Sequence, residues 1–225
     1  MDRQKINKEA RRLHYEIWHK RELLFPWGVP SHIAMCRPDV AARVLELEYE
    51  YRDNLGRFRA GPATYEVAGV LNRERGIVSV STRFSEAAVR FTGAHEIGHF
   101  LLHPGEVFHR DRPISNTPTE KRPSREQEAD YFAACFLASE KLIRQEFEPR
   151  FGSLPLRLTD TVAYHLRKER MQELLRASTE SLEFAAAVAG ARSFGGRNFV
   201  PLADRFGLSI SAMAIRLQEL GFVDG

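Results

Sequence analysis

The stretch "RFTGAHEIGHFLLHP", residues 90–104, places three histidines and a glutamate in a run that is otherwise typical of the buried face of a helix. Burying a polar side chain costs free energy unless the side chain finds a partner. A metal ion, hydrogen bonds within a core, or solvent could satisfy the four side chains, which are His95, Glu96, His99 and His103. The fold and the function both depend on which partner they have.

The spacing of these residues favours a metal. His95 and His99 are four positions apart, which puts both imidazoles on one face of a helix, where they can bind a single zinc ion. Glu96 is rotated by about 100° around the helix, close enough to reach a zinc-bound water without ligating the metal. This H-E-x-x-H arrangement is typical of zinc peptidases, in which zinc lowers the pKa of the water to about 7 and the glutamate accepts its proton.

A catalytic zinc also needs a third protein ligand. His103 continues the four-residue spacing, but it lies about 12 Å along the helix from His95. Pro104 also disfavours helical geometry at the residue before it. We therefore expect His103 to cap or stabilise the helix end. His109 and Asp111, in the segment that follows, are weaker candidates for the third ligand.

A better candidate lies in "EQEAD", residues 126–130. Glu126 and Asp130 share one helix face, as the two histidines do. We expect Glu126 to ligate zinc from a facing helix, and Asp130 to accept the free N–H of one zinc histidine, His95, which fixes its tautomer. Glu128 lies on a different face and is predicted to be solvated. An acidic first turn that complements the helix dipole is the alternative explanation of the same residues.

The composition is that of an ordinary globular protein, since 43% of the 225 residues are hydrophobic and 28% are charged. No run approaches the ~20 apolar residues of a membrane span, and the charged N-terminus lacks the apolar core of a signal peptide. We therefore expect a cytoplasmic protein with no membrane partner. Cys36 and Cys135 are expected to be reduced and buried. A net charge of +3 is too small to indicate a nucleic-acid partner.

The hydrophobic spacing predicts an α+β fold. Short β-rich segments between Tyr51 and Val80 indicate a small antiparallel sheet of three strands, packed on the active-site helix. Residues 104–123, rich in proline and arginine, are predicted to form a long exposed loop. Helices are predicted at residues 5–24, 39–49, 86–103, 124–147, 159–177 and 180–189.

The chain is predicted to divide into a metallopeptidase domain, residues 1–155, and an all-helical C-terminal region, residues 156–225. The tail "PLADRFGLSISAMAIRLQELGF", residues 201–222, predicts two helices joined at Gly207, with Ser209 or Ser211 as the cap of the second. Such a helix-turn-helix could bind DNA, dock a protein or complete a core. Its few basic residues are poorly suited to phosphate contacts, so we favour packing or protein docking over DNA binding.

The runs "GAHEIGHFLLH" and "EQEADYFAACFLAS" together resemble the ImmA/IrrE family of bacterial zinc metallopeptidases. The resemblance covers roughly residues 40–150. It implies zinc ligands His95, His99 and Glu126 and a catalytic Glu96. With two histidines and one carboxylate as ligands, we expect one Zn²⁺ per chain, with Mn²⁺ as the alternative metal.

The chain departs from the family pattern at two places. Asp130 stands where the family commonly has asparagine, which keeps a side-chain acceptor. "FLAS" stands where the family has "LLMP", which changes packing after the helix without touching a ligand. Family members characteristically cleave a helix-turn-helix repressor of a mobile element or a stress response. The resemblance therefore implies a protein substrate of that kind.

The sequence thus predicts a zinc endopeptidase that cleaves a transcriptional repressor. The alternatives are a non-catalytic, zinc-containing regulator that binds DNA or protein, and a zinc hydrolase of another substrate. Glu96 favours an enzyme, because a structural zinc site does not need it and is usually closed by a fourth protein ligand. Peptide hydrolysis also needs a donor for the developing oxyanion. The candidates for this donor are His103, Tyr131 and His165.

Overall fold

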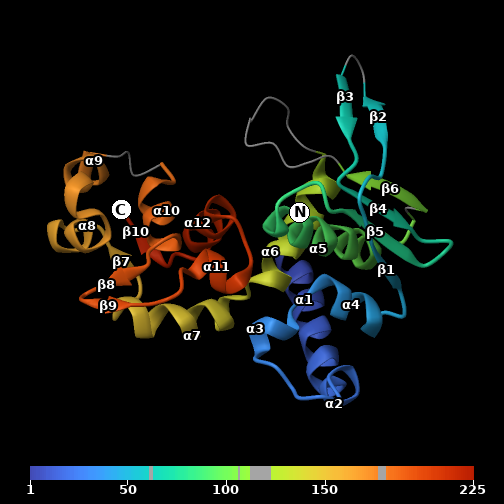
Figure 1. The fold of residues 1–225 in the computed structure, drawn as a ribbon, viewed down its shortest axis with the longest axis horizontal. Coiled ribbons are helices and arrows are strands. Elements are labelled where there is room, and N and C mark those ends of the chain that lie inside the picture. The colour runs from blue at the N-terminus through green and yellow to red at the C-terminus, as the bar shows by residue number, and fades with distance from the viewer. Residues whose placement is uncertain (61–62, 106, 112–122, 177–180) are drawn as a thin grey trace. The chain divides into compact units, whose positions relative to one another are not determined.

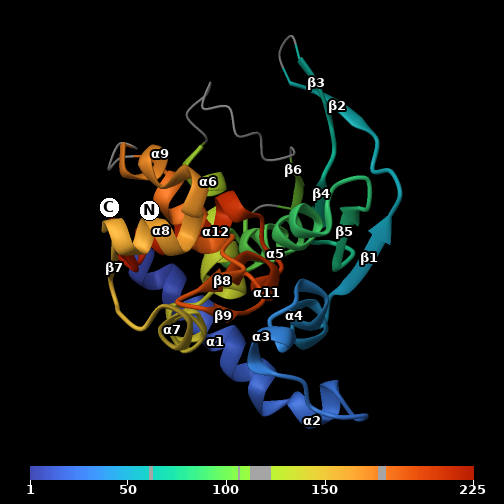
Figure 2. The same cartoon turned by 60° about the vertical axis from the view of Figure 1, so that its left-hand side comes forward.

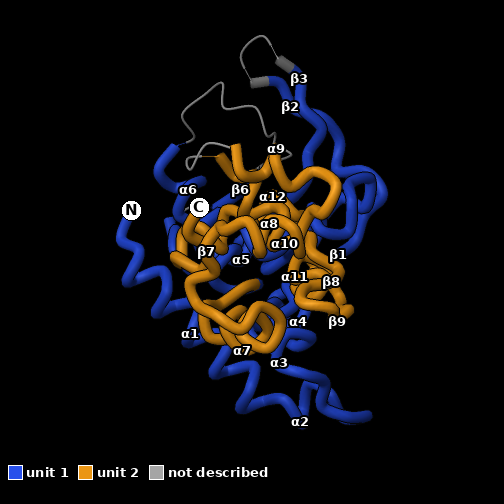
Figure 3. The backbone as a smooth tube through the Cα atoms, turned by 90° about the vertical axis from the view of Figure 1, so that its left-hand side faces the viewer, with its two compact units in different colours: residues 1–137 blue, residues 138–225 orange. Residues whose placement is uncertain are grey.

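The structure is a computed structural model that describes all residues except 61–62, 106, 112–122 and 177–180 (Figure 1). The chain forms two compact units, residues 1–137 and residues 138–225 (Figure 3). The predicted division into domains after residue 155 stays a prediction. Helices and short strands combine as the α+β class requires, and that prediction is confirmed. Among the described residues, no helix is long and apolar enough to cross a membrane.

The first unit is built around a four-stranded sheet with the strand order β1-β5-β4-β6. The pairs β5–β4 and β4–β6 are antiparallel, whereas β1 runs parallel to β5. The sheet is therefore mixed, and it has one strand more than the three that we expected. Its strands are β1 (Glu48–Arg52), β4 (Gly69–Asn72), β5 (Ile77–Ser81) and β6 (Phe108–Asp111).

Strand β1 occupies part of the segment 39–49 that was predicted to be helical. The helix there, α4 (Pro38–Val44), is shorter than expected. Glu46 follows it with a φ of 59°, in the left-handed region that non-glycine residues rarely adopt. The turn at Glu46 ends the helix and redirects the chain into β1. Because β1 has the largely polar sequence "EYEYR", no apolar alternation reveals it.

A second pair of strands, β2 (Arg57–Ala60) and β3 (Ala63–Glu66), forms a separate antiparallel hairpin. Figures 1 and 2 both show this hairpin extending away from the main sheet. Strand β6 lies at the edge of the main sheet next to β4, with Leu71 opposite His109. The segment 104–123, predicted to be a loop, therefore contains an edge strand, and its residues 112–122 lie outside the described part of the chain.

The N-terminal segment of the first unit is helical. Helix α1 (Arg3–His19) starts at Asp2, whose carboxylate accepts a hydrogen bond from the Lys5 amide. It packs on α6 (Ser124–Leu137), where an imidazole nitrogen of His14 lies 2.7 Å from the Phe136 carbonyl oxygen. Two short helices follow α1, namely α2 (Arg21–Leu24) and α3 (His32–Met35). The apolar stripe of α1 consists of Ile6, Ala10, Leu13 and Ile17.

Helix α5 (Glu86–Leu102) carries the H-E-x-x-H stretch and contacts both the sheet and α6. It begins at Ser85, whose hydroxyl accepts a hydrogen bond from the Ala88 amide. At Gly98, an added Cβ would lie 3.1 Å from Cδ1 of Phe132 and 3.2 Å from the carbonyl oxygen of Ala129. The glycine therefore allows the close approach of α5 and α6 on which the site depends.

An arginine stabilises the last turn of α5. Nη2 of Arg73 donates to the carbonyl oxygens of His99, Phe100 and His103, at 3.1, 2.9 and 3.2 Å. The last carbonyls of a helix have no intrahelical donor and carry partial negative charge, so a cation is favourable there. The guanidinium also lies over the Phe100 ring, 4.6 Å from its centroid.

The single helix predicted for residues 124–147 is wrong. The chain instead forms α6 and α7 (Glu140–Phe151), separated by Ala138 and Ser139. Ser139 has the extended conformation of a helix N-cap, with φ −66° and ψ 147°. Pro149, two residues beyond the predicted helix end at residue 147, lies inside the last turn of α7. The helix ends at Gly152, whose φ is 76°.

The second unit is mainly helical and, within its described residues, also contains four two-residue strands. Strand β7 (Leu156–Arg157) pairs parallel with β10 (Val223–Asp224), and β8 (Ser193–Phe194) pairs with β9 (Arg197–Asn198). The C-terminal region, which we expected to be all-helical, therefore also contains two short β-ladders. Besides α7, its helices are α8 (Asp160–Arg167), the 3₁₀ turn Lys168–Arg170, α9 (Met171–Arg176), α10 (Glu183–Ala189), α11 (Leu202–Phe206) and α12 (Ile210–Glu219).

The predicted helix pair of the tail is present as α11 and α12. Gly207 joins them with a φ of 62°, and the Ser209 hydroxyl accepts a hydrogen bond from the Ala212 amide. Helix α12 packs against α10. Arg216, only 2% exposed, uses its Nε to donate to the Ala138 carbonyl oxygen at 3.1 Å. Within the second unit, α12 is therefore part of the core.

Candidate metal centre

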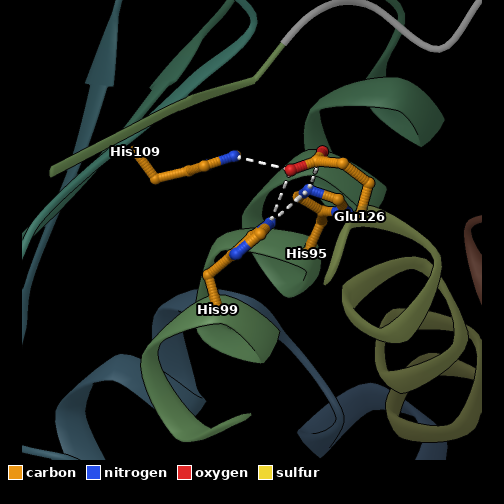
Figure 4. Close-up of side chains that lie close together, drawn as sticks. All are labelled: His95, His99, His109 and Glu126. Carbon is orange, nitrogen blue, oxygen red and sulfur yellow. Dashed lines mark hydrogen bonds and ion pairs between the residues drawn. The ribbon is translucent and has the colours of Figure 1, made fainter. Parts of the chain in front are cut away.

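Four side chains of the first unit converge on one point, three from the two helices α5 and α6 and one from strand β6 (Figure 4). One ligand atom from each lies within 4.8 Å of all the others. We call this group the His–Glu cluster. The two histidines from α5 are fully buried, the histidine from β6 is nearly so, and the glutamate from α6 has 19% of its side chain exposed. Its members are His95, His99, His109 and Glu126.

The spacing of the donor atoms matches the needs of a tetrahedral metal ion. Nε2 of His95 lies 3.0 Å from Nε2 of His99, and each of these nitrogens lies 3.5 Å from a Glu126 oxygen. Nε2 of His109 lies 3.0 Å from Oε1 of Glu126. Donors ~2.0–2.1 Å from a zinc ion are about 3.4 Å apart in a tetrahedron. Nitrogen and carboxylate donors at this spacing fit a zinc site.

The ring of His95 is oriented by Asp130. Its Nδ1–H donates to Oδ1 of Asp130 at 2.9 Å, which leaves the lone pair of Nε2 directed into the His–Glu cluster. A carboxylate in this place fixes the tautomer of a metal histidine and raises its basicity. The contact is the one that the sequence predicted between these two residues, and its effect on a metal stays to be measured.

A second chain of hydrogen bonds orients His99. Nε2–H of His103 donates to Oε2 of Glu128 at 3.1 Å, so Nδ1 of His103 can accept from Nδ1–H of His99, also 3.1 Å away. This leaves the Nε2 lone pair of His99 for the His–Glu cluster. His103 is the C-cap residue of α5, as predicted, and its amide donates to the His99 carbonyl. Glu128, which we predicted to be solvated, keeps 26% of its side chain exposed and also accepts this hydrogen bond from His103.

Glu96 lies beside the His–Glu cluster and is completely buried. Its Oε2 accepts a hydrogen bond from Nδ1 of His109 at 3.1 Å. Its Oε1 has no hydrogen-bond partner among the residues that the structure describes. Gly69 of β4 leaves room for this carboxylate, since a Cβ there would lie 2.7 Å from Oε1. An unsatisfied buried carboxylate oxygen is costly, and such an atom is suited to receiving a proton.

His109 is the member that the sequence identified only weakly. It lies on β6, where pairing with β4 places it opposite Leu71 and directs its ring toward α5. The ring stacks on that of His99, with 3.7 Å between centroids and 23° between planes. Its position depends on strand pairing rather than on helical spacing, and its only local signal is a histidine in the short run "VFHR". The side chain of Asp111, the other weak candidate, lies outside the described part of the structure.

The electrostatics reflect two carboxylates that face three imidazoles. Burial, together with His95 and His109, lowers the pKa of His99 to about 2, so this ring is neutral. Burial opposes charge on His109 as well, but hydrogen bonds to Glu126 and Glu96 outweigh it and raise the pKa to about 10. Burial would raise the pKa of Glu126, yet its interactions with His109 and His95 outweigh burial and lower the pKa. Without a metal, the protonated His109 supplies the positive charge that the two carboxylates need.

The other candidates for an oxyanion donor lie elsewhere. The Tyr131 hydroxyl accepts a hydrogen bond from Nδ2 of Asn7 on α1, at 3.1 Å. His165 belongs to the second unit, where its ring contacts Phe194 edge-on with 5.4 Å between centroids. His103 contacts the cluster through His99. The structure thus brings His95, Glu96, His99, His109 and Glu126 together, with Asp130 and His103 behind the two helix histidines.

Comparison with known proteins agrees with this geometry. The family model described as the IrrE N-terminal-like domain, a peptidase family, matches residues 57–218. The match covers more than half of the chain, includes every residue of the His–Glu cluster and extends into the second unit. No curated protein gives a significant match. The resemblance seen in the sequence is confirmed, and the chain belongs to the M78 family of metallopeptidases, which has the IrrE N-terminal-like domain.

Proposed function

We propose that the protein is a zinc endopeptidase that cleaves a helix-turn-helix transcriptional repressor in the cytoplasm, in stress response or in mobile-element control. The observation that supports catalysis most strongly is the position of Glu96. A fully buried carboxylate with one unpartnered oxygen lies next to a cluster of metal-binding side chains. Membership of a metallopeptidase family gives the same reaction class. The repressor as substrate rests on the family resemblance.

The roles of the residues follow from their contacts. His95, His99 and Glu126 would hold the metal, with Asp130 and His103 orienting the two imidazoles. When bound, zinc would polarise the scissile carbonyl and make a nearby water more acidic. Glu96 takes the proton from the attacking water at its free Oε1 and then delivers it to the leaving amine nitrogen. The carboxylate is thus first a general base and then a general acid.

Strand β6 offers a place for an extended substrate. It is the last strand of its sheet, and within the described residues its other edge has no paired strand. A peptide segment can add to such an edge through main-chain hydrogen bonds, with alternate side chains on each face. Because β6 carries His109, a segment bound there would run past the His–Glu cluster. A peptide bond could in this way be aligned with Glu96.

The alternative function is a zinc-containing regulator that binds DNA or protein without catalysis. His109 as a fourth donor favours this alternative, because structural zinc sites are closed by four protein ligands. The buried Glu96 argues against it, since a structural site gains nothing from an unsatisfied carboxylate oxygen. The helix pair α11–α12 buries much of its surface inside the second unit, which favours packing over DNA contact.

Two measurements on purified protein test the site. The parent protein should bind about one zinc ion per chain, and the double variant His95→Ala, His99→Ala should lose it. The Glu96→Gln variant keeps the shape of the side chain and should retain the zinc. Full zinc occupancy in the double variant would contradict the assignment of the metal centre.

The proposed reaction is tested with helix-turn-helix proteins encoded beside this gene. Each is incubated with the zinc-loaded protein, and the fragments are identified by mass spectrometry. Glu96→Gln should slow cleavage by ~10²–10⁴-fold, the usual contribution of general acid–base catalysis. Equal cleavage rates for the parent protein and for Glu96→Gln would rule out this role for Glu96. Binding of a repressor without cleavage would favour the regulator.

A further inference from the structure

We propose that His109 is a fourth protein ligand that closes the metal centre, and that Glu96 holds it in place until substrate displaces it. The inference rests on the proposed metal site and adds a latent state to it. In this state His109 occupies the fourth coordination position and also binds Oε2 of the general base, Glu96. His109 would have to leave before a substrate carbonyl or a water could enter.

His109 lies close to the other donors of the His–Glu cluster. Its ligand atom lies within 4.8 Å of those of His95, His99 and Glu126, and its Nε2 is 3.0 Å from Oε1 of Glu126. A tetrahedral zinc site requires donor separations of about 3.4 Å. An oxyanion donor would instead leave a gap between itself and the ligands for the substrate oxygen. His109 thus lies close enough to the other three donors to serve as a fourth ligand.

The other ring nitrogen of His109, Nδ1, has the kind of partner that metal-binding histidines have. Metal-binding histidines generally donate their second N–H to a carboxylate, a carbonyl or water. His95 does so with Asp130 at 2.9 Å, and His109 does so with Glu96 at 3.1 Å. Glu96 thus stands in the same relation to His109 as Asp130 does to His95. Glu96, the glutamate of the H-E-x-x-H stretch, therefore orients the proposed fourth ligand, His109.

The elements that carry the four side chains differ in how easily they can move. His95, His99 and Glu126 come from α5 and α6, two helices that pack closely at Gly98. His109 comes from β6, which is paired only with β4 among the described strands. His109 can therefore leave with a small shift of one edge strand, whereas the three helix ligands cannot separate without unpacking the helices. A peptide that pairs with the edge of β6 could supply this shift.

The test uses full-length protein that carries either Zn²⁺ or Co²⁺, with acetohydroxamate as the probe of an open coordination position. His109→Gln keeps a polar group between Glu96 and Glu126 but is a poor metal ligand, and His109→Ala removes the group. His32→Ala, at an exposed histidine outside the His–Glu cluster, is the matched control. Circular dichroism verifies that each variant is folded. Zinc affinity is measured by competition with a chromophoric chelator.

Both His109 variants should bind zinc at least ~10–100-fold more weakly, since even residues behind a ligand have effects of that size. The visible bands of bound Co²⁺ should shift, and added imidazole should restore the parental bands in His109→Ala. Acetohydroxamate should bind the variants more tightly than it binds the parent, whereas His32→Ala should behave as the parent.

Unchanged zinc affinity and unchanged Co²⁺ bands in a folded His109 variant would overturn this inference and leave the proposed peptidase intact. A parent protein that binds acetohydroxamate as tightly as His109→Ala does would overturn it as well. A parent protein that binds no zinc would instead overturn the proposed function, and the inference with it. The two failures are therefore distinguishable.

Discussion

His95 and Asp130 lie on two different helices and are joined by a hydrogen bond of 2.9 Å between Nδ1 and Oδ1. The bond fixes which nitrogen of the imidazole carries the proton, and it directs the other nitrogen to the three remaining members of the His–Glu cluster. It also links the packing of the two helices to the geometry of the proposed metal site, because α6 supplies both Asp130 and the proposed ligand Glu126. The relationship can be tested one residue at a time.

Asp130→Ala should weaken zinc binding by ~10–100-fold, because the imidazole of His95 then loses both its orientation and its carboxylate partner. Asp130→Asn should have a smaller effect, since the amide oxygen still accepts the hydrogen bond. Chelator competition measures both affinities. Asp53→Ala, at an exposed aspartate, is the control. Equal zinc affinity in Asp130→Ala and the parent would contradict the role of Asp130.

His103→Phe should also weaken zinc binding, because Nδ1 of His99 loses its acceptor and the ring is free to choose the wrong tautomer. Glu128→Gln, one step further from the cluster, should have a weaker effect in the same direction. Metal affinity is again the readout. If His103→Phe binds zinc as well as the parent while its Co²⁺ spectrum is unchanged, the chain from Glu128 to His99 has no function in metal binding.

Gly98→Val should force α5 and α6 apart, because the Cβ already comes within 3.1–3.2 Å of Phe132 and Ala129 before the γ carbons are added. Overpacking of this kind costs ~1–3 kcal/mol of stability, and zinc affinity should fall with it. Urea unfolding measures the stability. Gly105→Ala is the control, since a Cβ there meets no atom within 4 Å. A Gly98→Val protein with parental stability would show that the helix contact is adaptable.

Cys36 should be unreactive in the folded protein. Burial raises the pKa of its thiol to about 12, against a weaker opposing effect of Arg90, so almost no thiolate exists at pH 8. Because the folded protein holds the thiol proton more tightly than the unfolded chain does, the free energy of unfolding should fall as the pH rises from about 9 toward 12. A thiol reagent at pH 8 should modify a Cys135→Ser variant only in denaturant. Rapid modification of the native variant would contradict the burial of Cys36.

A chain that ends at Gly190 should keep its zinc but melt early. All cluster residues belong to the first unit, whereas α12 packs on α10 in the second. Removal of α12 exposes Phe184 and Val188, each worth ~1.5–3 kcal/mol of burial. Thermal melting and zinc content measure the two effects. A truncated protein with parental melting would mean that α12 has no structural role, and would favour substrate docking by the tail.

The parts of the site that rest on helical periodicity were predictable from the sequence. His95 and His99 on one helix, and Glu126 and Asp130 on another, follow from four-residue spacing, and the structure places them face to face. The helix break at Ser139 was missed, although serine followed by Glu140 is a typical helix start. The apolar spacing continues across this break and gives the appearance of one helix.

The position of His109 could not be derived in the same way. It depends on the pairing of β6 with β4 across more than thirty residues, and such pairing leaves little trace in a single sequence. Strand β1 was missed for a related reason, because its pairing with β5 is parallel and its side chains are largely exposed. Contacts that are remote in sequence thus determined both the mixed sheet and the fourth donor.

Arg73 has a mechanical consequence for the His–Glu cluster. Helix ends fray most readily in their last turn, where carbonyls lack partners. His99 stands in that turn of α5, and fraying there would move its imidazole relative to His95. The guanidinium of Arg73 donates to three carbonyl oxygens at the end of α5. Because Arg73 directly follows β4, these hydrogen bonds hold the last turn of the helix against the sheet. The distance between the two helix histidines is thereby protected from the local opening that would otherwise begin next to it.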